Sequence, residues 1–222
     1  MKPIAIIDCA IESPSYNCMN KIVQSHGIPF TYHWVSTFGT DSLDFIDEAS
    51  GYIIFGSDSN VSDRLPWQID LSKRMKAKIE AGIPVLGICF GHQLMADAYG
   101  ATIDLVKPDN RCFEGTRKQK VLTDHLGFKT NEELEIFITH HYEVKNLPQE
   151  FIHLSTSSDC FYDGLAHKTK PFFSFQGHPE ASRHFVENHI ESKLPEEQVL
   201  SGLSGGNRVI SNFIELVRLT SV

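Results

Sequence analysis

Apolar residues gather in short runs along the first half of the chain, and amphipathic stretches separate them. The runs predict buried strands at residues 4–7, 30–35, 51–55 and 83–88. Helices are predicted at residues 17–26, 66–81 and 92–99, each followed directly by a glycine, a common helix-ending residue. In the second of these helices, Ile69, Met75 and Ile79 are predicted to share the buried face. This alternation is typical of an α/β fold in which a doubly wound, mostly parallel sheet carries helices on both faces.

The second half of the chain is richer in predicted strands, at residues 103–106, 119–122, 135–139, 151–155 and 172–175. An amphipathic closing helix is predicted over residues 207–219. The stretch 194–206 before it contains one proline and three glycines, and is predicted to be a loose insertion between two helices. We expect residues 1–222 to form a single domain, because this length is ordinary for one hydrophobic core.

A first chemical motif, Gly87-Ile88-Cys89-Phe90-Gly91, joins the fourth predicted strand to the helix that follows it. It has the form of a nucleophile elbow, Gly-x-nucleophile-x-Gly, with cysteine in the central place. Cys89 would stand at the N-terminus of the helix, where the helix dipole and free N–H groups favour the thiolate. The motif therefore predicts an activated cysteine nucleophile, with an inert buried thiol as the alternative.

A second motif, Gln176-Gly177-His178-Pro179-Glu180, follows the last predicted strand. A cysteine nucleophile needs a base to accept its proton and a third group to orient that base. His178 and Glu180 are two residues apart, so in an extended chain their side chains point to the same side. We therefore predict a catalytic triad of Cys89, His178 and Glu180.

Taken together, the motifs Gly-Ile-Cys-Phe-Gly-His-Gln and Gln-Gly-His-Pro-Glu resemble those of the class I glutamine amidotransferases, the Cys-His-Glu glutaminases. The chain looks most similar to the glutaminase part of GMP synthase, with some resemblance to the small subunit of carbamoyl-phosphate synthetase. The resemblance runs from the first predicted strand to the last helix. It implies a flavodoxin-like glutaminase fold with a small additional antiparallel sheet, and hydrolysis of the glutamine side-chain amide through a cysteine thioester.

The resemblance also implies an oxyanion hole. The backbone N–H of Phe90, directly after the nucleophile, is one expected donor. The family's other donor lies in a turn after the third strand, usually Gly-Gly-Pro, and the matching stretch here is Gly56-Ser57-Asp58. Asp58 stands near the place of the second glycine, and its charge would oppose an oxyanion. Three interpretations stay open: Gly56 or Ser57 donates, the hole forms only in some states, or the activity is weak.

Residues that would hold the substrate follow from the same resemblance. Gln93, one helical turn into the elbow helix, is expected to contact the substrate glutamine, and Glu114 to line its pocket. His140, His141 and Tyr142 match the segment that holds the amino-acid end of the substrate, although GMP synthases tend to have aspartate in the place of Tyr142. Neighbouring histidines on a strand point to opposite faces, so no metal site is predicted.

Composition excludes several other functions. The net charge of −8 argues against a nucleic-acid partner, and Arg117, Lys118 and Lys120 are predicted to form only a solvated basic face. No apolar run is long enough to cross a membrane, and no signal peptide is predicted at the first residues. The five cysteines are odd in number and lack a Cys-x-x-Cys pair, which favours reduced thiols in the cytoplasm. No cofactor is expected.

The predicted function is glutamine hydrolysis with ammonia passed to a separate synthetase subunit. The sequence contains no Gly-x-x-x-x-Gly-Lys nucleotide loop, and its length leaves no room for a synthetase. The stretch 194–206 is predicted to form part of the docking surface. Two alternatives stay open: a stand-alone γ-glutamyl hydrolase that uses the same triad in a wider pocket, and a catalytically weak regulatory relative.

Overall fold

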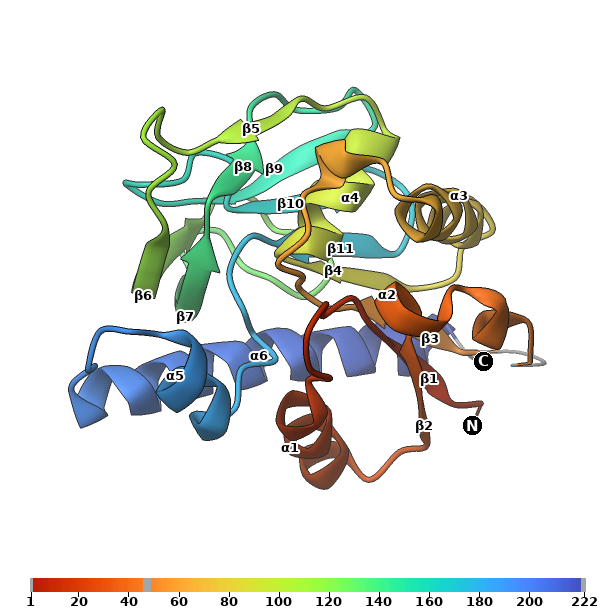
Figure 1. Cartoon of the computed structure of the whole chain (residues 1–222), viewed down its shortest axis with the longest axis horizontal. Coiled ribbons are helices and arrows are strands. Elements are labelled where there is room, and N and C mark those ends of the chain that lie inside the picture. The colour runs from red at the N-terminus through yellow and green to blue at the C-terminus, as the bar shows by residue number, and fades with distance from the viewer. Residues whose placement is uncertain (1, 46–48, 221–222) are drawn as a thin grey trace.

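Helices and strands alternate along the first half of the computed structural model, which describes residues 2–45 and 49–220 (Figure 1). The strands of this half are β1 (Ile4–Asp8), β2 (Phe30–Trp34), β3 (Gly51–Ile54) and β4 (Val85–Ile88). Its helices are α1 (Tyr16–His26), α2 (Val35–Phe38), α3 (Pro66–Glu80) and α4 (Phe90–Ala98), with single 3₁₀ turns at Asp41–Phe45 and Val61–Asp63.

The second half is richer in strands, as predicted. Its strands are β5 (Ile103–Leu105), β6 (Phe113–Val121), β7 (Glu133–His140), β8 (Tyr142–Val144), β9 (Phe151–Thr156), β10 (Gly164–His167) and β11 (Phe172–Phe175). Two helices close the chain, α5 (Arg183–His189) and α6 (Glu196–Thr220).

One large sheet organises the molecule, with strand order β2-β1-β3-β4-β11-β10-β9-β6-β7. The strands from β2 to β11 pair in parallel, and those from β11 to β7 pair antiparallel. β5 and β8 form a separate antiparallel pair. This architecture confirms the predicted α/β fold with a mostly parallel sheet, flanking helices and a small additional antiparallel sheet.

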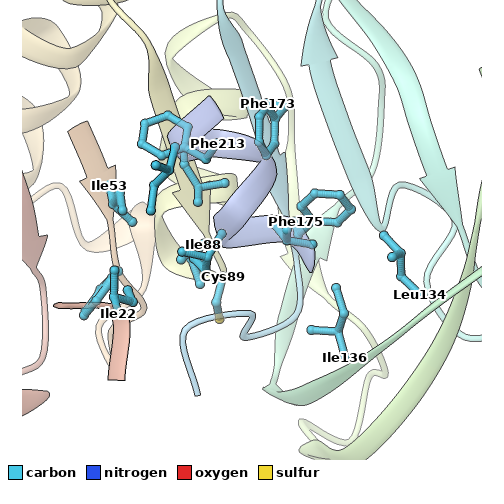
Figure 2. Close-up of a cluster of buried hydrophobic side chains, with 14 of the residues drawn as sticks. Ile22, Ile53, Ile88, Cys89, Leu134, Ile136, Phe173, Phe175 and Phe213 are labelled. Atoms are coloured by element: carbon cyan, nitrogen blue, oxygen red, sulfur yellow. The ribbon is translucent and has the colours of Figure 1, made fainter. Parts of the chain in front are cut away.

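Helices cover the sheet on both faces, which explains why the inner parallel strands β1, β3, β4 and β11 are fully buried and mostly apolar. α1 and α6 pack on one face, and α3 and α4 on the other. The core between α6 and the sheet is dominated by aromatic and aliphatic side chains, among them Phe173, Phe175 and Phe213 (Figure 2). Cys89 lies at the end of β4 beside Ile88, at the border of this cluster. The core therefore fixes the position of the elbow directly.

The buried face of α3 differs from the prediction at one position. Ile69 is 40% exposed, while Leu71, Met75 and Ile79 are buried. Counting back from Met75 in helical steps of four and three leads to Leu71 and Gln68, so Ile69 falls on the outer side. Gln68 is buried because its amide donates to Ser59 Oγ and to the Asn60 carbonyl oxygen, which satisfies its polar group.

The predicted loose insertion at 194–206 is wrong, because most of it is the first half of α6. A side chain at Gly202 would place its Cβ 2.6 Å from the Phe137 ring, and one at Gly205 or Gly206 would meet the backbone of Glu135 or Pro179. The glycines therefore do not loosen the chain; they let the helix approach β7 and the His178 loop closely. Residues 194–206 are therefore not a loose segment, and their part in a docking surface stays a prediction.

Gly205 supplies a test of this packing. Alanine favours a helix over glycine by about 0.8–1.0 kcal/mol, but overpacking a tight contact costs about 1–3 kcal/mol. We expect Gly205→Ala to lower the free energy of unfolding, because its Cβ would collide with the Glu135 carbonyl oxygen. Urea unfolding should show a lower midpoint for this variant, whereas Ser204→Ala, at the exposed neighbouring position, should leave the midpoint equal or higher. A higher midpoint for Gly205→Ala would contradict the close contact.

Candidate active site

The turn between β4 and α4 places Cys89 in a strained backbone conformation. Its φ of 48° and ψ of −100° are rare for a residue with a side chain, and cost about 1–3 kcal/mol. A Cβ at Gly87 would lie 2.8 Å from the Gly91 carbonyl oxygen, and one at Gly91 would lie 2.6 Å from that of Ile54. Only glycine therefore fits on either side of this turn. The result is the sharp strand-to-helix elbow that the sequence motif predicts.

Strand pairing brings the second motif to the elbow. β11 lies parallel to β4 with Phe175 opposite Ile88, so the residues after both strands leave the sheet at the same edge. The His178 N–H donates to the Phe137 carbonyl oxygen on β7, which anchors the loop from the other side. The loop turns at this point, with the Ala181 N–H donating to the His178 carbonyl oxygen, so the extended path predicted for residues 178–180 is wrong.

His178 and Glu180 nevertheless contact each other across this turn. His178 Nδ1 lies 2.8 Å from Glu180 Oε1, and both side chains are buried. Because a carboxylate only accepts, Nδ1 carries the proton and Nε2 is left for the nucleophile. Nε2 lies 3.4 Å from the Thr139 carbonyl oxygen, and Cys89 Sγ lies 3.9 Å from the same oxygen. The histidine and the thiol therefore converge on one point.

The charge state of His178 suits a thiolate–imidazolium pair. Burial lowers the pKa of His178, but the Glu180 carboxylate and Cys89 outweigh this effect, and the pKa stands well above its usual value. The Thr139 carbonyl oxygen beside Nε2 is also an acceptor, which favours a proton on that nitrogen. His178 is therefore held ready to keep a proton beside the sulfur of Cys89.

Two glutamines complete the surroundings of the sulfur. Gln176 Nε2 lies 3.6 Å from Cys89 Sγ, and its Oε1 accepts at 3.1 Å from Gln93 Nε2. Gln93 also donates at 2.8 Å to the Tyr142 carbonyl oxygen. This chain of contacts fixes the Gln176 amide so that a donor faces the sulfur. Gln176 belongs to the second sequence motif, but its contact with the thiol depends on the pairing of β11 with β4 and has no signal in the sequence.

The residues of the predicted oxyanion hole lie around the same cavity. Phe90 supplies the first N–H of α4, which has no partner within the helix. On the opposite side, a Cβ at Gly56 would lie 2.8 Å from His178 Cε1, so the turn after β3 presses against the base. Ser57 turns its hydroxyl to the Ser59 N–H, and Asp58 is exposed at the cavity wall.

His140 lies in the cavity wall, held by a buried ion pair. Arg117 binds Asp163 through two hydrogen bonds of 2.8 and 2.7 Å and donates at 3.0 Å to His140 Nε2. His140 Nδ1 therefore carries the ring proton and donates to the Tyr142 carbonyl oxygen. Burial, with the Arg117 charge, lowers the pKa of His140 to about 3, so the ring is neutral. Arg117 is therefore buried, and the predicted solvated basic face is wrong for this residue. The ion pair could not be predicted because Asp163 lies 46 positions later in the sequence.

The remaining predicted substrate residues divide between cavity and surface. His141 and Tyr142 line the cavity, and His141 Nδ1 lies 2.8 Å from the Asn110 carbonyl oxygen. Glu114 is not among the lining residues. Its carboxylate accepts from the Glu191 N–H and from the Ser192 N–H and hydroxyl, which ties β6 to the segment after α5. The structure thus brings together the other ten predicted site residues: Ser57, Asp58, Cys89, Phe90, Gln93, His140, His141, Tyr142, His178 and Glu180.

The cavity itself has a volume of about 790 Å³. Besides the triad, its wall includes residues 10–18, which run from the loop after β1 into the start of α1, and the α5 residues His184, Phe185 and His189. Within residues 2–45 and 49–220, no cluster of three or more histidine, cysteine, aspartate or glutamate side chains is placed to hold a metal ion. The described helices include none that is both long and apolar enough to cross a membrane.

Comparisons with known proteins find similar sequences and structures. The family model described as glutamine amidotransferase class-I matches residues 5–193. The chain is similar to a subunit of glutamine-hydrolyzing GMP synthase from Methanopyrus kandleri, at 30% identity over 143 residues, which is 64% of this chain and 72% of that protein. It is 36% identical over 107 residues to the protein of the same name from Methanothermobacter thermautotrophicus. That match spans 48% of this chain and little more than half, 56%, of the relative.

Solved structures share the fold at lower identity. A glutamine amidotransferase from Thermotoga maritima superposes with a TM-score of 0.76 at 18% identity, over 100% of this chain and 99% of that one. A glutamine amidotransferase from Methylobacillus flagellatus superposes with a TM-score of 0.68 at 20% identity, over 99% of this chain and 90% of that one.

Proposed function

The chain belongs to the class-I glutamine amidotransferases, and on that premise we propose that it hydrolyses the side-chain amide of glutamine and delivers the ammonia to a separate synthetase. The observation that carries the proposal is the arrangement of Cys89, His178 and Glu180 at one edge of the sheet. His178 Nδ1 is fixed by Glu180 at 2.8 Å, and its Nε2 shares the Thr139 carbonyl oxygen with the Cys89 sulfur.

In the first step, the Cys89 thiolate attacks the carboxamide carbon of glutamine, and the carbonyl oxygen becomes an oxyanion. The Phe90 N–H stabilises this charge, and the turn at Gly56-Ser57 is the place where a second donor is expected. His178 then transfers its Nε2 proton to the amide nitrogen, the C–N bond breaks, and ammonia leaves. The product on the enzyme is a thioester between Cys89 and the γ-carbonyl of glutamate.

In the second step, neutral His178 takes a proton from a water molecule, and the resulting hydroxide attacks the thioester carbon. The C–S bond breaks, glutamate leaves, and the Cys89 thiolate and the His178 imidazolium are restored. Glu180 keeps the same hydrogen bond to Nδ1 through both steps and so orients the ring for each proton transfer.

The direct test is ammonia release from glutamine by the purified chain, with asparagine as the control substrate. Asparagine carries the same amide on a side chain one methylene shorter, so it should react far more slowly. If ammonia is not released from glutamine with or without a synthetase, the proposed function is wrong.

The partner belongs to the same proposal. The relatives named as subunits of GMP synthase are, by that name, parts of a larger enzyme. We extend this to the present chain: residues 1–222 act as a single glutaminase domain whose ammonia is used by a separate synthetase in the cytoplasm. All five cysteines are free thiols, which agrees with a reducing compartment.

A second candidate function is a stand-alone γ-glutamyl hydrolase. The observation that favours it is the cavity of about 790 Å³, which is in the range that accommodates drug-sized ligands. A γ-glutamyl amide with a larger amine would fit beside residues 10–18 and α5. Comparison of kcat/KM for glutamine with that for γ-glutamyl conjugates separates the two functions.

Asp58 gives a prediction for the weakened oxyanion hole. One missing donor raises the barrier by about 3–4 kcal/mol, so we expect slow hydrolysis by the isolated chain. Asp58→Gly should raise kcat, because it removes a negative charge and frees the peptide to turn a N–H inward. Asp58→Asn is the matched control, since it removes the charge and keeps the side chain. A fast wild-type enzyme that Asp58→Gly slows would mean that Asp58 has a positive role.

A further inference from the structure

A chain of hydrogen bonds runs from the buried ion pair behind the cavity to the carbonyl oxygen of Tyr142. The Arg117 side chain is 4% exposed and that of its partner Asp163 is fully buried. Besides its two bonds to Asp163, the guanidinium donates to His140 Nε2. Because arginine only donates, Nε2 must accept and Nδ1 must carry the ring proton. Arg117 thus fixes the tautomer in which His140 Nδ1 can donate, at 3.0 Å, to the Tyr142 carbonyl oxygen.

The Tyr142 carbonyl oxygen is the junction of two such chains. It also accepts at 2.8 Å from Gln93 Nε2, and a carbonyl oxygen has two lone pairs, so the two donors occupy both. The Gln93 side continues through Gln176 to the Cys89 sulfur and does not pass through His140. The peptide group after Tyr142 is therefore held from two directions, one of which begins at the nucleophile and the other at the ion pair.

This peptide group lies on the part of the cavity wall that the far end of a substrate can reach. The Thr139 carbonyl oxygen is 3.9 Å from Cys89 Sγ, and residues 140–142 line the cavity beyond it. A strand advances by about 3.3 Å per residue, so a glutamine whose carboxamide lies at the sulfur can reach residues 140–142 with its amino-acid end. Arg117 is not among the lining residues and can act on this end only through His140.

We propose that Arg117 is a positioning residue for substrate binding: through His140 it fixes the Tyr142 peptide, and with it the wall that holds the amino-acid end of glutamine. This inference rests on the proposed function, because it assigns Arg117 a part in binding the same substrate. Arg117 acts on binding and not on the chemical steps, since the contacts of the sulfur with Gln176 and of His178 with Glu180 do not include it.

Arg117→Lys separates the contact with His140 from the ion pair. A lysine ammonium keeps the charge beside Asp163 but lacks the planar fork that serves Asp163 and His140 together. We expect KM for glutamine to rise about tenfold, the size of one lost hydrogen bond between buried groups, and kcat to change less than about threefold. Steady-state ammonia release at varied glutamine concentration measures both constants.

Two electrophiles then measure binding apart from the reactivity of Cys89. Acivicin carries the amino-acid end of glutamine, whereas iodoacetamide does not. Arg117→Lys should lower the second-order rate constant for labelling by acivicin about tenfold and change that for iodoacetamide less than about twofold, because only acivicin uses the wall at residues 140–142. A variant that merely loosens the fold would change both rate constants together.

Two further variants separate binding from packing. Arg208→Lys is the matched control, because Arg208 also pairs with a carboxylate, that of Glu132, and donates to a backbone carbonyl, that of Gly127, away from the cavity. It should keep KM and both labelling rates. If circular dichroism shows that Arg117→Lys is unfolded, the double variant Arg117→Met/Asp163→Leu replaces it. Apolar replacement of a buried ion pair is often neutral for stability, and it still removes the donor, so the same rise in KM is expected.

A double-mutant cycle tests the path through His140. His140→Leu should itself raise KM, and in that background Arg117→Lys should change KM less than about twofold. Independent, additive effects, a fall in kcat at unchanged KM, or equal losses with the two electrophiles would each overturn the proposal. If acivicin labelling depends on Arg117 as expected but the wild type releases no ammonia from glutamine, only the proposed function fails. If the wild type releases ammonia and the folded Arg117 variants keep its KM, only this inference fails.

Discussion

Replacing Cys89 by alanine is expected to remove glutamine hydrolysis, with a fall in kcat on the order of 10⁶-fold, the loss found when the nucleophile of a serine triad is removed. We expect no other cysteine to replace it, because the elbow places the Cys89 sulfur beside His178 Nε2, where both atoms lie near the Thr139 carbonyl oxygen. The fold should survive, since alanine leaves the packing of Ile88 and Phe90 intact. Ammonia release measures the activity, and thermal unfolding checks the fold.

A glutamine-like electrophile should also label Cys89 selectively. Burial raises the pKa of Cys9 and of Cys160, and raises that of Cys18 to about 12, so these thiols stay protonated at neutral pH. Cys112 is the matched control, because it is only half-buried and its sulfur lies 3.6 Å from the Thr139 hydroxyl. Cys112→Ala should keep both activity and labelling. Labelling spread over several cysteines, or an active Cys89→Ala protein, would remove Cys89 from the nucleophile role.

Much of this site could be predicted because its signals are local in the sequence. Gly87 and Gly91 mark a turn that only glycine allows, and the structure contains that turn around Cys89. The apolar runs of the parallel strands are equally direct, because strands buried on both faces carry few polar residues. From these two signals the order of strand, elbow and helix follows, and with it the edge of the sheet where the site lies.

What could not be predicted depends on contacts between distant residues. Arg117 has the sequence appearance of a surface charge, and becomes buried only because Asp163 is brought to it. Lys21 likewise has the sequence appearance of an ordinary polar residue of an amphipathic helix. In the structure its ammonium donates to the carbonyl oxygens of Pro179 and Ala181 in the His178 loop. The three glycines of α6 suggest a loop in the sequence, but in the structure they allow close contact with β7 and with the His178 loop. β8 and β10 were not predicted from the sequence.

Replacing His178 by asparagine is expected to have an effect as large as the loss of Cys89, again on the order of 10⁶-fold in kcat. Asparagine can accept or donate a hydrogen bond but cannot exchange a proton near neutral pH, so neither the departure of ammonia nor the attack of water is assisted. Iodoacetamide labelling of Cys89 should slow as well, because the thiolate loses the imidazolium beside it. His184→Asn is the control, since His184 lines the same cavity from α5. Unchanged labelling in His178→Asn would show that the thiolate is stabilised by α4 alone.

Glu180→Gln distinguishes orientation and charge from direct chemistry. Burial lowers the pKa of His178 and the Glu180 carboxylate raises it, so the amide should let the pKa fall. The imidazolium that protonates the departing ammonia exists below this pKa, so the alkaline limb of the kcat/KM profile for glutamine should move to lower pH in the variant. The loss in kcat should be about 10⁴-fold, smaller than that of His178→Asn, because the base itself is still present. If Glu180→Gln keeps the wild-type rate and the wild-type alkaline limb, the carboxylate only supports the loop, and the triad reduces to Cys89 and His178.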